Sequence, residues 1–337
     1  MRVAYCGNFG SAVGLGAEVA AGAAHATTES HWAGSLERLG HEVMRVDEER
    51  TPWAERVRIA ESCDMFLWTS TWAFNAAWTP LADGFRSVRY LHERGVPTAC
   101  VHLDRWHGLA NRERQVTDRR TGSAMFACDF VFTADGDSDD WFRSHDVNHF
   151  WLPPGVYEPE CVPGTPRDEW RSDVAFIGGW QDYGHSEHWE HRKAMLDALR
   201  AAFGDRAAFW PKVGEPGPWG SDYNDLLASV KVVVGDAWRD ARRYFSNRAV
   251  EVIGRGGFCV HPWIEGLAER IPEGCGVAYF PPGDWDAMCD LVEHYSTHDD
   301  ERLEAVAKGQ AHVLSSETYT HRMAEMLSTM QAAGAWR

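Results

Sequence analysis

Residues 246–260 read SNRAVEVIGRGGFCV, and the expected fold follows from them. Ser246 is a good N-cap, because its hydroxyl can accept a hydrogen bond from a backbone N–H in the first turn of a helix. Gly254 and the pair at 256–257 allow the backbone conformations that end a helix tightly. Residues 258–260 form an apolar run that is typical of a parallel strand buried on both faces. The stretch therefore predicts a short helix, a glycine stop and a strand.

Two charged residues of this helix indicate a ligand. Arg248 and Glu251 are three residues apart, so they lie on one helix face near its positive end. A cation and a helix N-terminus both favour a phosphate, and a carboxylate one turn further along can accept hydrogen bonds from sugar hydroxyls. This arrangement is the outline of a nucleotide-sugar site.

The pattern SNRxxExxxxGGF, followed by ETYTHR at residues 317–322, resembles the C-terminal half of GT-B glycosyltransferases. The nearest group is the spore-maturation-type branch of glycosyl transferases group 1, and the resemblance extends over about residues 173–327. It implies an α/β fold with two Rossmann-like, doubly wound parallel-sheet domains that face a cleft. It also implies a donor site on the second domain and an acceptor site on the first.

Composition fits a protein of this kind. The chain has 337 residues, which favours two domains. A formal charge of -17 gives no general attraction for nucleic acid or anionic membranes. The apolar runs, such as residues 65–68 and 232–234, are far shorter than the roughly 20 residues of a membrane span. Residues 1–6 run directly into a strand without a signal-peptide pattern, so we expect a cytoplasmic protein.

Strands and helices are expected to alternate in two blocks, which favours doubly wound parallel sheets. The first block, residues 1–152, has expected strands at 2–6, 41–46, 65–69, 97–103, 130–133 and 149–152, and helices at 31–39, 52–62 and 85–94. Residues 153–172 are rich in proline and are interpreted as a linker. The second block, residues 173–314, has expected strands at 173–177, 207–210, 231–234, 258–261 and 277–279, and helices at 190–203, 221–229 (with Ser221 as N-cap), 265–270, 284–296 and 301–314. Residues 315–337 are expected to form a C-terminal helix that packs back on the first domain, as in other GT-B proteins.

Several residues of the second block are candidates for donor binding. The glycines of the loop after its first strand allow a diphosphate to approach backbone N–H groups, and Arg192 has the geometry to bind a phosphate. The resemblance places the loop after residues 232–234 near the base of the donor, and the residues just before the helix near the pyrophosphate. The donor candidates are Gly178, Gly179, Trp180, Arg192, Asp236, Trp238, Tyr244, Ser246, Asn247, Arg248 and Glu251.

Glu251 matches the second glutamate of the paired-glutamate motif of retaining GT-B enzymes, which holds the donor ribose. The first glutamate of that motif would fall near Arg243 or Tyr244 and is absent. The plainer interpretation of Glu251 is an ion pair with Arg255, four residues further along the helix. Retention of the anomeric configuration is the first expectation, with the phosphate as base, and inversion stays the alternative.

On the acceptor side, residues 101–107 leave a strand toward the expected cleft. A carboxylate or imidazole there can activate an acceptor hydroxyl, which makes Asp104 the first candidate base and His107 the second. The plainer interpretation of Asp104 is a turn or cap residue. The remaining acceptor-side candidates are Gly7, Asn8 and Trp72.

No metal or other cofactor is expected. His185, His188 and His191 have a spacing that would align them on a helix, but a wet helix start or a substrate-facing loop is the simpler interpretation. Gly14-x-Gly16 comes too late after the first strand for a dinucleotide turn. The eight cysteines form no CxxC pair and are expected to be reduced, several of them within strands.

The sequence therefore predicts a hexosyltransferase-type glycosyltransferase that moves a sugar from a nucleotide diphosphate sugar to an acceptor hydroxyl. Three alternatives stay open. A nucleotide-sugar epimerase of the same fold would consume donor without an acceptor. A non-catalytic nucleotide-sugar-binding protein would bind the donor without turnover. A transferase acting on modified DNA bases would shift duplex DNA in a salt-sensitive manner.

Overall fold

The computed structural model describes residues 1–9, 27–70, 81–118, 122–179, 187–212, 217–237 and 242–336, with only the backbone described at 81–82 and 187–188. The chain divides into two compact units. Unit 1 comprises Met1–Pro153 together with Tyr319–Arg337, and unit 2 comprises Pro154–Thr318. The chain therefore passes from one unit to the other twice.

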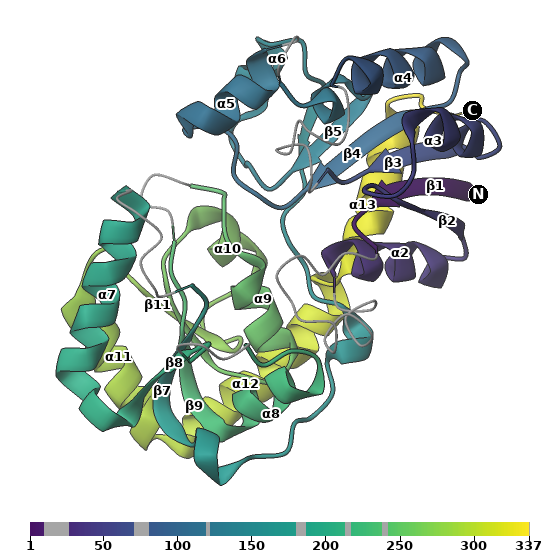
Figure 1. Cartoon of the computed structure of the whole chain (residues 1–337). Coiled ribbons are helices and arrows are strands. Elements are labelled where there is room, and N and C mark those ends of the chain that lie inside the picture. The colour runs from purple at the N-terminus through teal and green to yellow at the C-terminus, as the bar shows by residue number, and fades with distance from the viewer. Residues whose placement is uncertain are drawn as a thin grey trace. The chain divides into compact units, whose positions relative to one another are not determined.

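Unit 1 contains a sheet of six parallel strands within the described residues, in the order β2-β1-β3-β4-β5-β6 (Figure 1). Each of the strands expected from apolar runs in residues 1–152 is present, with its ends shifted by at most one residue. The strands are β1 (Arg2–Gly7), β2 (Glu42–Asp47), β3 (Met65–Trp68), β4 (Thr98–His102), β5 (Phe130–Thr133) and β6 (His149–Trp151).

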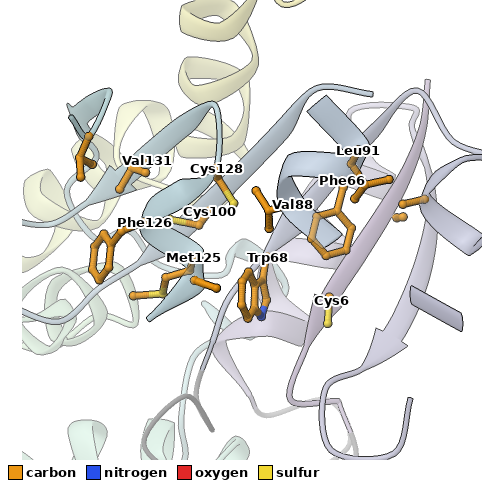
Figure 2. Close-up of a cluster of buried hydrophobic side chains, with 14 of the residues drawn as sticks. Cys6, Phe66, Trp68, Val88, Leu91, Cys100, Met125, Phe126, Cys128 and Val131 are labelled. Carbon is orange, nitrogen blue, oxygen red and sulfur yellow. The ribbon is translucent and has the colours of Figure 1, made fainter. Parts of the chain in front are cut away.

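Helices cover both faces of this sheet, as expected for a parallel sheet. The helices of unit 1 are α2 (Thr28–Arg38), α3 (Trp53–Ala60), α4 (Leu81–Glu93), α5 (Ala110–Thr117), α6 (Asp139–Arg143), α13 (Tyr319–Ala332) and the 3₁₀ turn η1 (Ala124–Ala127). In Figure 1, α3 and α4 lie on one face and α2 and α13 on the other. Figure 2 shows the core of the first face, where Phe66 and Trp68 of β3 meet Val88 and Leu91 of α4.

Unit 2 repeats this design with five parallel strands in the described part of the chain, ordered β11-β10-β9-β7-β8. The strands are β7 (Ser172–Ile177), β8 (Ala207–Trp210), β9 (Val230–Val234), β10 (Cys259–Pro262) and β11 (Val277–Phe280). The helices are α7 (Glu187–Phe203), α8 (Ser221–Ser229), α9 (Asn247–Gly254), α10 (Glu265–Arg270), α11 (Trp285–Thr297) and α12 (Asp299–Ser316), with short 3₁₀ turns at Glu158–Glu160, Asp168–Trp170 and Gly204–Arg206. The doubly wound α/β architecture predicted from the sequence is confirmed for both units.

The stretch at residues 246–260 folds as predicted. The hydroxyl of Ser246 accepts a hydrogen bond from the N–H of Arg248 at 3.3 Å, and α9 begins at the next residue. The helix ends at Gly254, and Gly256 follows with φ of 85° in the left-handed region that favours glycine. The buried strand β10 then starts at Cys259 and pairs in parallel with β9 and β11.

Other predictions differ in detail from the structure. The N-cap of α8 is Gly220, and the Ser221 hydroxyl that was predicted to cap this helix lies inside its first turn. The sequence did not predict α5 and α6, because both are short and carry mostly polar or charged residues.

The proline-rich residues 153–172 pack against unit 2. Val156 forms a bridge with Thr318, and the backbone carbonyl of Glu160 accepts a hydrogen bond from Asn224 at 2.9 Å. Arg167 contacts Asp225 at 2.6 Å. These contacts anchor the segment along much of its length.

Candidate functional site

The strand orders locate the ligand-binding edge of each unit. In both sheets the first strand lies between the second and the third, so the direction in which successive strands are added across the sheet reverses there. In open α/β sheets ligands bind beyond the carboxyl ends of the strands at such a switch point. In unit 2 this point lies between β7 and β9, where Gly178 follows β7 and Asp236 follows β9 by two residues.

Three charged side chains meet at this point. The Asp236 carboxylate accepts a hydrogen bond from Arg192 Nε to its Oδ2 and another from Arg248 Nη1 to its Oδ1, both at 2.7 Å. The exposed fractions of the side chains are 4% for Asp236, 16% for Arg192 and 19% for Arg248. These three residues, which we call the arginine cluster, bring together α7, the end of β9 and α9.

The surrounding chain supports the arginine cluster. Arg192 also donates from Nη1 to the carbonyl oxygen of Gly179 at 2.8 Å. Both guanidinium groups lie near the ring of Phe176 on β7, with centroid distances of 5.7 Å for Arg192 and 5.1 Å for Arg248. A Cβ atom at Gly178 would displace the guanidinium of Arg248, and the φ of 154° at this position also favours glycine.

A cavity of about 110 Å³ opens at the cluster. It is lined by Arg192, Asp236, Ala237, Tyr244, Phe245, Ser246 and Arg248. The start of α9 therefore borders the cavity, where the positive end of the helix dipole adds to the net single positive charge of the cluster. An anion with more than one charged oxygen is the chemical class that such a site favours.

His261 lies beneath this site on β10. Burial lowers its pKa to about 4, although the Pro262 carbonyl and Asp236 act in the opposite direction. The imidazole is therefore neutral at pH 7, and its ring packs closely against Gly235. The positive charge of the site thus comes from the two arginines and not from this histidine.

Glu251 lies one turn further along α9 and does not line the cavity. Its Oε1 accepts a hydrogen bond from Asn247 at 3.1 Å. Arg255, the partner considered in the plainer interpretation, instead contacts Glu160 and donates to Asn224 Oδ1 at 3.0 Å. The role of Glu251 in holding a ribose stays a prediction.

Unit 1 has a pocket of about 250 Å³ at the corresponding edge of its sheet. It is lined by Thr28, Glu29, Trp32, Thr69, His102, Leu103 and Asp104. Glu29 lies in the first turn of α2 and is buried, and a Cβ atom at Gly7 would lie 2.9 Å from its Cγ. The carboxylate of Asp104 forms an ion pair with Arg112 at 3.0 Å. Among the described residues, the lining of this pocket includes two carboxylates and no arginine or lysine.

The two histidines near Asp104 have structural partners. His102 Nδ1 accepts a hydrogen bond from the backbone N–H of Asp104 at 3.1 Å, and burial lowers the pKa of the imidazole. His107 stacks on Trp141 at 4.7 Å, and its Nδ1 lies 3.0 Å from the hydroxyl of Ser138. Asp104 therefore lines the pocket, whereas His107 packs beside it and is not among the lining residues.

The structure thus gathers most of the donor candidates and leaves others untested. The residues that come together are Gly178, Gly179, Arg192, Asp236, Tyr244, Ser246 and Arg248. Asn247 is the first residue of α9, and Glu251 lies one turn further along the helix. Gly7 is the last residue of β1, and Asn8 follows it at the carboxyl edge of the sheet. Trp72, Trp180 and Trp238 lie outside the described residues, as does His185.

Sequence reasoning missed two features of these sites. The bridging role of Asp236 depends on Arg192, which is 44 residues away in sequence, so no local sequence pattern predicts it. Glu29 had a usable signal, because Thr27 caps α2 and accepts a hydrogen bond from Ser30 N–H, which places Glu29 in the first turn. Among the described side chains, no three His, Cys, Asp or Glu residues converge as metal ligands do, and the imidazole of His191 packs against Trp285 at 4.8 Å.

Comparisons with known proteins agree with this fold. Residues 190–328 match a family model described as glycosyl transferase-like, and no curated protein matches the chain. The Anabaena protein HepE, solved in complex with UDP and glucose, is similar with 12% identity and a TM-score of 0.62, over 98% of this chain and 100% of that one. This chain has the GT-B glycosyltransferase fold. The family match lies mainly in unit 2.

Two further solved structures have the same fold. An alpha-glucosyltransferase, solved with UDP-glucose and DNA containing an abasic site, is 11% identical with a TM-score of 0.65, over 98% of this chain and 99% of that one. AviGT4, a glycosyltransferase involved in avilamycin A biosynthesis, is 14% identical with a TM-score of 0.56, over 100% and 99% of the two chains. None of the helices in the described part of the protein has the length and apolar character needed to cross a bilayer.

Proposed function

We propose that this protein transfers a sugar from a nucleotide diphosphate sugar to an acceptor hydroxyl. The observation that carries the proposal is the arginine cluster at the switch point of unit 2, beside the capped start of α9. Two guanidinium groups and a helix N-terminus directed at one small cavity suit a diphosphate. The family match over residues 190–328 includes both arginines, which supports the same assignment.

The cluster would act in the transition state, when the bond between sugar and diphosphate breaks and negative charge develops on the leaving group. Fixed cations near that charge lower the barrier, because they need no rearrangement at the moment of reaction. We therefore expect Arg192 and Arg248 to replace a divalent metal in this role. Glu251 would accept hydrogen bonds from hydroxyls of the donor ribose or sugar.

The acceptor would bind in the pocket of unit 1, with Asp104 positioning its hydroxyl. Glu29 and Asp104 in this pocket disfavour an anionic acceptor. The base candidates are both engaged, since Asp104 is paired with Arg112 and His107 is held between Trp141 and Ser138. This favours a retaining reaction in which the departing phosphate takes the proton from the acceptor. The protein would act as a soluble cytoplasmic enzyme.

The test is a screen of nucleoside diphosphates for thermal stabilisation, followed by incubation of the best nucleotide's sugars with candidate acceptors. A ligand that binds only the native state raises the melting temperature, by an amount that grows with its concentration. UDP is the first probe, because HepE and the alpha-glucosyltransferase were solved with UDP or UDP-glucose. We expect stabilisation by one nucleoside diphosphate and a sugar-bearing product. Donor consumption without an acceptor would point to the epimerase, and binding without turnover on any acceptor would point to a binding protein.

A further inference from the structure

We propose that Asp236 is a positioning residue that holds Arg192 and Arg248 side by side, so that the site prefers two linked phosphates to one. This inference rests on the proposed function, because it concerns the diphosphate of the donor. It assigns Asp236 a task other than base recognition, the role expected from its place after β9. Whether Asp236 also contacts the base stays a prediction.

The geometry of the carboxylate supports this role. Arg192 and Arg248 each bond to a different oxygen of Asp236, at 2.7 Å. Because both contacts end on one carboxylate, the guanidinium groups are held close together despite their like charges. Asp236 is nearly inaccessible to solvent, so water and salt screen this repulsion only weakly. Removing the negative charge would therefore allow the two arginines to separate.

The backbone that carries Asp236 is itself fixed. Gly235 donates its N–H to the carbonyl oxygen of Val260 at 2.9 Å, and there is no room for a side chain at Gly235 because His261 packs against it. The two arginines come from different helices, 44 and 12 residues away in sequence. Asp236 is thus a fixed point from which the positions of α7 and α9 side chains are set.

A fixed pair of guanidinium groups matches two adjacent phosphates better than one. Each guanidinium has five N–H donors, so a bond to Asp236 does not exhaust its capacity to bind a phosphate. A diphosphate can engage both groups at once, whereas a monophosphate gains from one group and only a little from the other. The spacing of the pair, and not its charge alone, would therefore determine the preference.

The test measures the affinities of a nucleoside diphosphate and the matching monophosphate for the wild type and for Asp236→Asn. The wild type should prefer the diphosphate. In the variant the net charge of the cluster rises from one to two, so the monophosphate should bind at least as well as before. The measured quantity is the dissociation constant of the monophosphate divided by that of the diphosphate. We expect this ratio to fall about tenfold in the variant, the scale of one lost charge-assisted hydrogen bond. The donor KM should rise more than kcat falls.

Asp197→Asn is the matched control, because Asp197 also contacts two cations, Lys193 and Arg200, but on the exposed side of α7. Its ratio should equal that of the wild type. If Asp236→Asn does not fold, Arg192→Lys provides the second variant, since lysine keeps the charge but cannot contact Asp236 and the Gly179 carbonyl as a planar fork. It should lower the ratio in the same way.

Three results would overturn the inference. A ratio within twofold of the wild type in a folded Asp236→Asn variant means that Asp236 does not set the spacing. An equal loss of affinity for both nucleotides means a merely structural role. If the wild type binds no nucleoside diphosphate, the proposed function fails and this inference fails with it.

Discussion

The two units have the same order of strands around the switch point and opposite charges at it. In unit 2 the edge beyond β7 and β9 carries two arginines joined by one aspartate. In unit 1 the pocket at the corresponding edge carries Glu29 and Asp104, and its described lining residues include no arginine or lysine. The topology alone therefore locates where a ligand binds, and the side chains that follow the strands decide which ligand is accepted.

The contrast divides the proposed reaction into two tasks. An anionic leaving group needs fixed cations, and unit 2 supplies them. An acceptor hydroxyl needs hydrogen-bond acceptors, and unit 1 supplies carboxylates. The net charge of -17 does not reveal the cationic site, because that site is small and almost buried. The predictions below test it from the largest expected effect to the smallest.

The largest effect concerns pH, since one buried group in each unit responds in the opposite sense. Burial lowers the pKa of His261 in unit 2 to about 4, and it raises the pKa of Asp135 in unit 1 to about 6. For His261 the unfolded state takes up a proton first, so its contribution to stability is complete above pH 6.5 and is lost as the pH falls toward 4. For Asp135 the folded state takes up the proton first, so stability is lost as the pH rises from about 4 to 6.

Each group changes the free energy of unfolding by at most about 3 kcal/mol, because its pKa in the folded protein differs from its ordinary value by roughly two. The measurement is the unfolding free energy in urea between pH 4 and 7 for the wild type, His261→Gln and Asp135→Asn. The difference between wild type and variant should slope in opposite directions for the two substitutions. Parallel curves for all three proteins would show that neither group titrates as described.

Arg248→Ala should cause the next largest change. It removes one of the two cations of the arginine cluster and leaves the buried carboxylate of Asp236 with one partner fewer. We expect kcat/KM for the donor to fall roughly a hundredfold. This corresponds to a loss of about 2–3 kcal/mol of transition-state stabilisation, the upper range for a hydrogen bond to a charged group. Arg200→Ala, which removes an exposed ion-paired arginine from α7, serves as control. If Arg248→Ala turned over the donor as fast as the wild type, the arginine cluster of unit 2 would not be the donor site.

Glu251→Gln should have a smaller effect on the same substrate. The amide keeps the size of the side chain but loses the charge that strengthens hydrogen bonds from sugar hydroxyls. The expected loss is about 1–2 kcal/mol in donor kcat/KM. Glu304→Gln, at an exposed carboxylate paired with Lys308, is the control. An unchanged donor KM and kcat would show that α9 contributes only its first turn to the site.

Asp104→Asn should give the smallest effect, and it should be confined to the acceptor. The ion pair with Arg112 is half-exposed and contributes little to stability. We expect the acceptor KM to rise by about threefold to tenfold, the scale of one weakened hydrogen bond, with the donor KM unchanged. Asp140→Asn, a fully exposed carboxylate of unit 1, provides the control. If the donor KM rose as much as the acceptor KM, Asp104 would not act on the acceptor alone, and the proposed division of tasks between the units would be wrong.

The sequence predicted those parts of the fold that depend on local signals. Apolar runs such as Met65–Trp68 and Val230–Val234 marked strands, since a strand buried on both faces needs few polar residues. Ser246 marked the start of α9 through its hydroxyl cap, and Asp284, the first residue of the helix predicted at 284–296, caps α11 with its carboxylate. Ser221 misled because the same residue type is tolerated inside a first turn, where Gly220 had already begun the helix.

The candidate site was only partly predictable, because its contacts join residues distant in the chain. Arg192 reads in the sequence as one cation among several on a helix, and only the fold brings it to Asp236. Lys193, its neighbour, turns outward to Asp197 instead. Glu251 was expected either at a ligand or beside Arg255, and the structure pairs Arg255 elsewhere because the segment before β7 supplies Glu160. Such choices depend on tertiary packing, which spacing along the chain does not encode.

The return of the chain at Tyr319 has a consequence for synthesis on the ribosome. Tyr319 packs edge-on against Trp32, with centroids 6.0 Å apart, and Met323, Met326 and Met330 are buried in the same unit. Unit 1, whose translation starts first, is therefore completed only after the whole of unit 2 has been synthesised. Until Tyr319–Ala332 have emerged from the ribosome, Trp32 and its neighbours on α2 lack this cover, and this interval is when a chaperone would have most to bind.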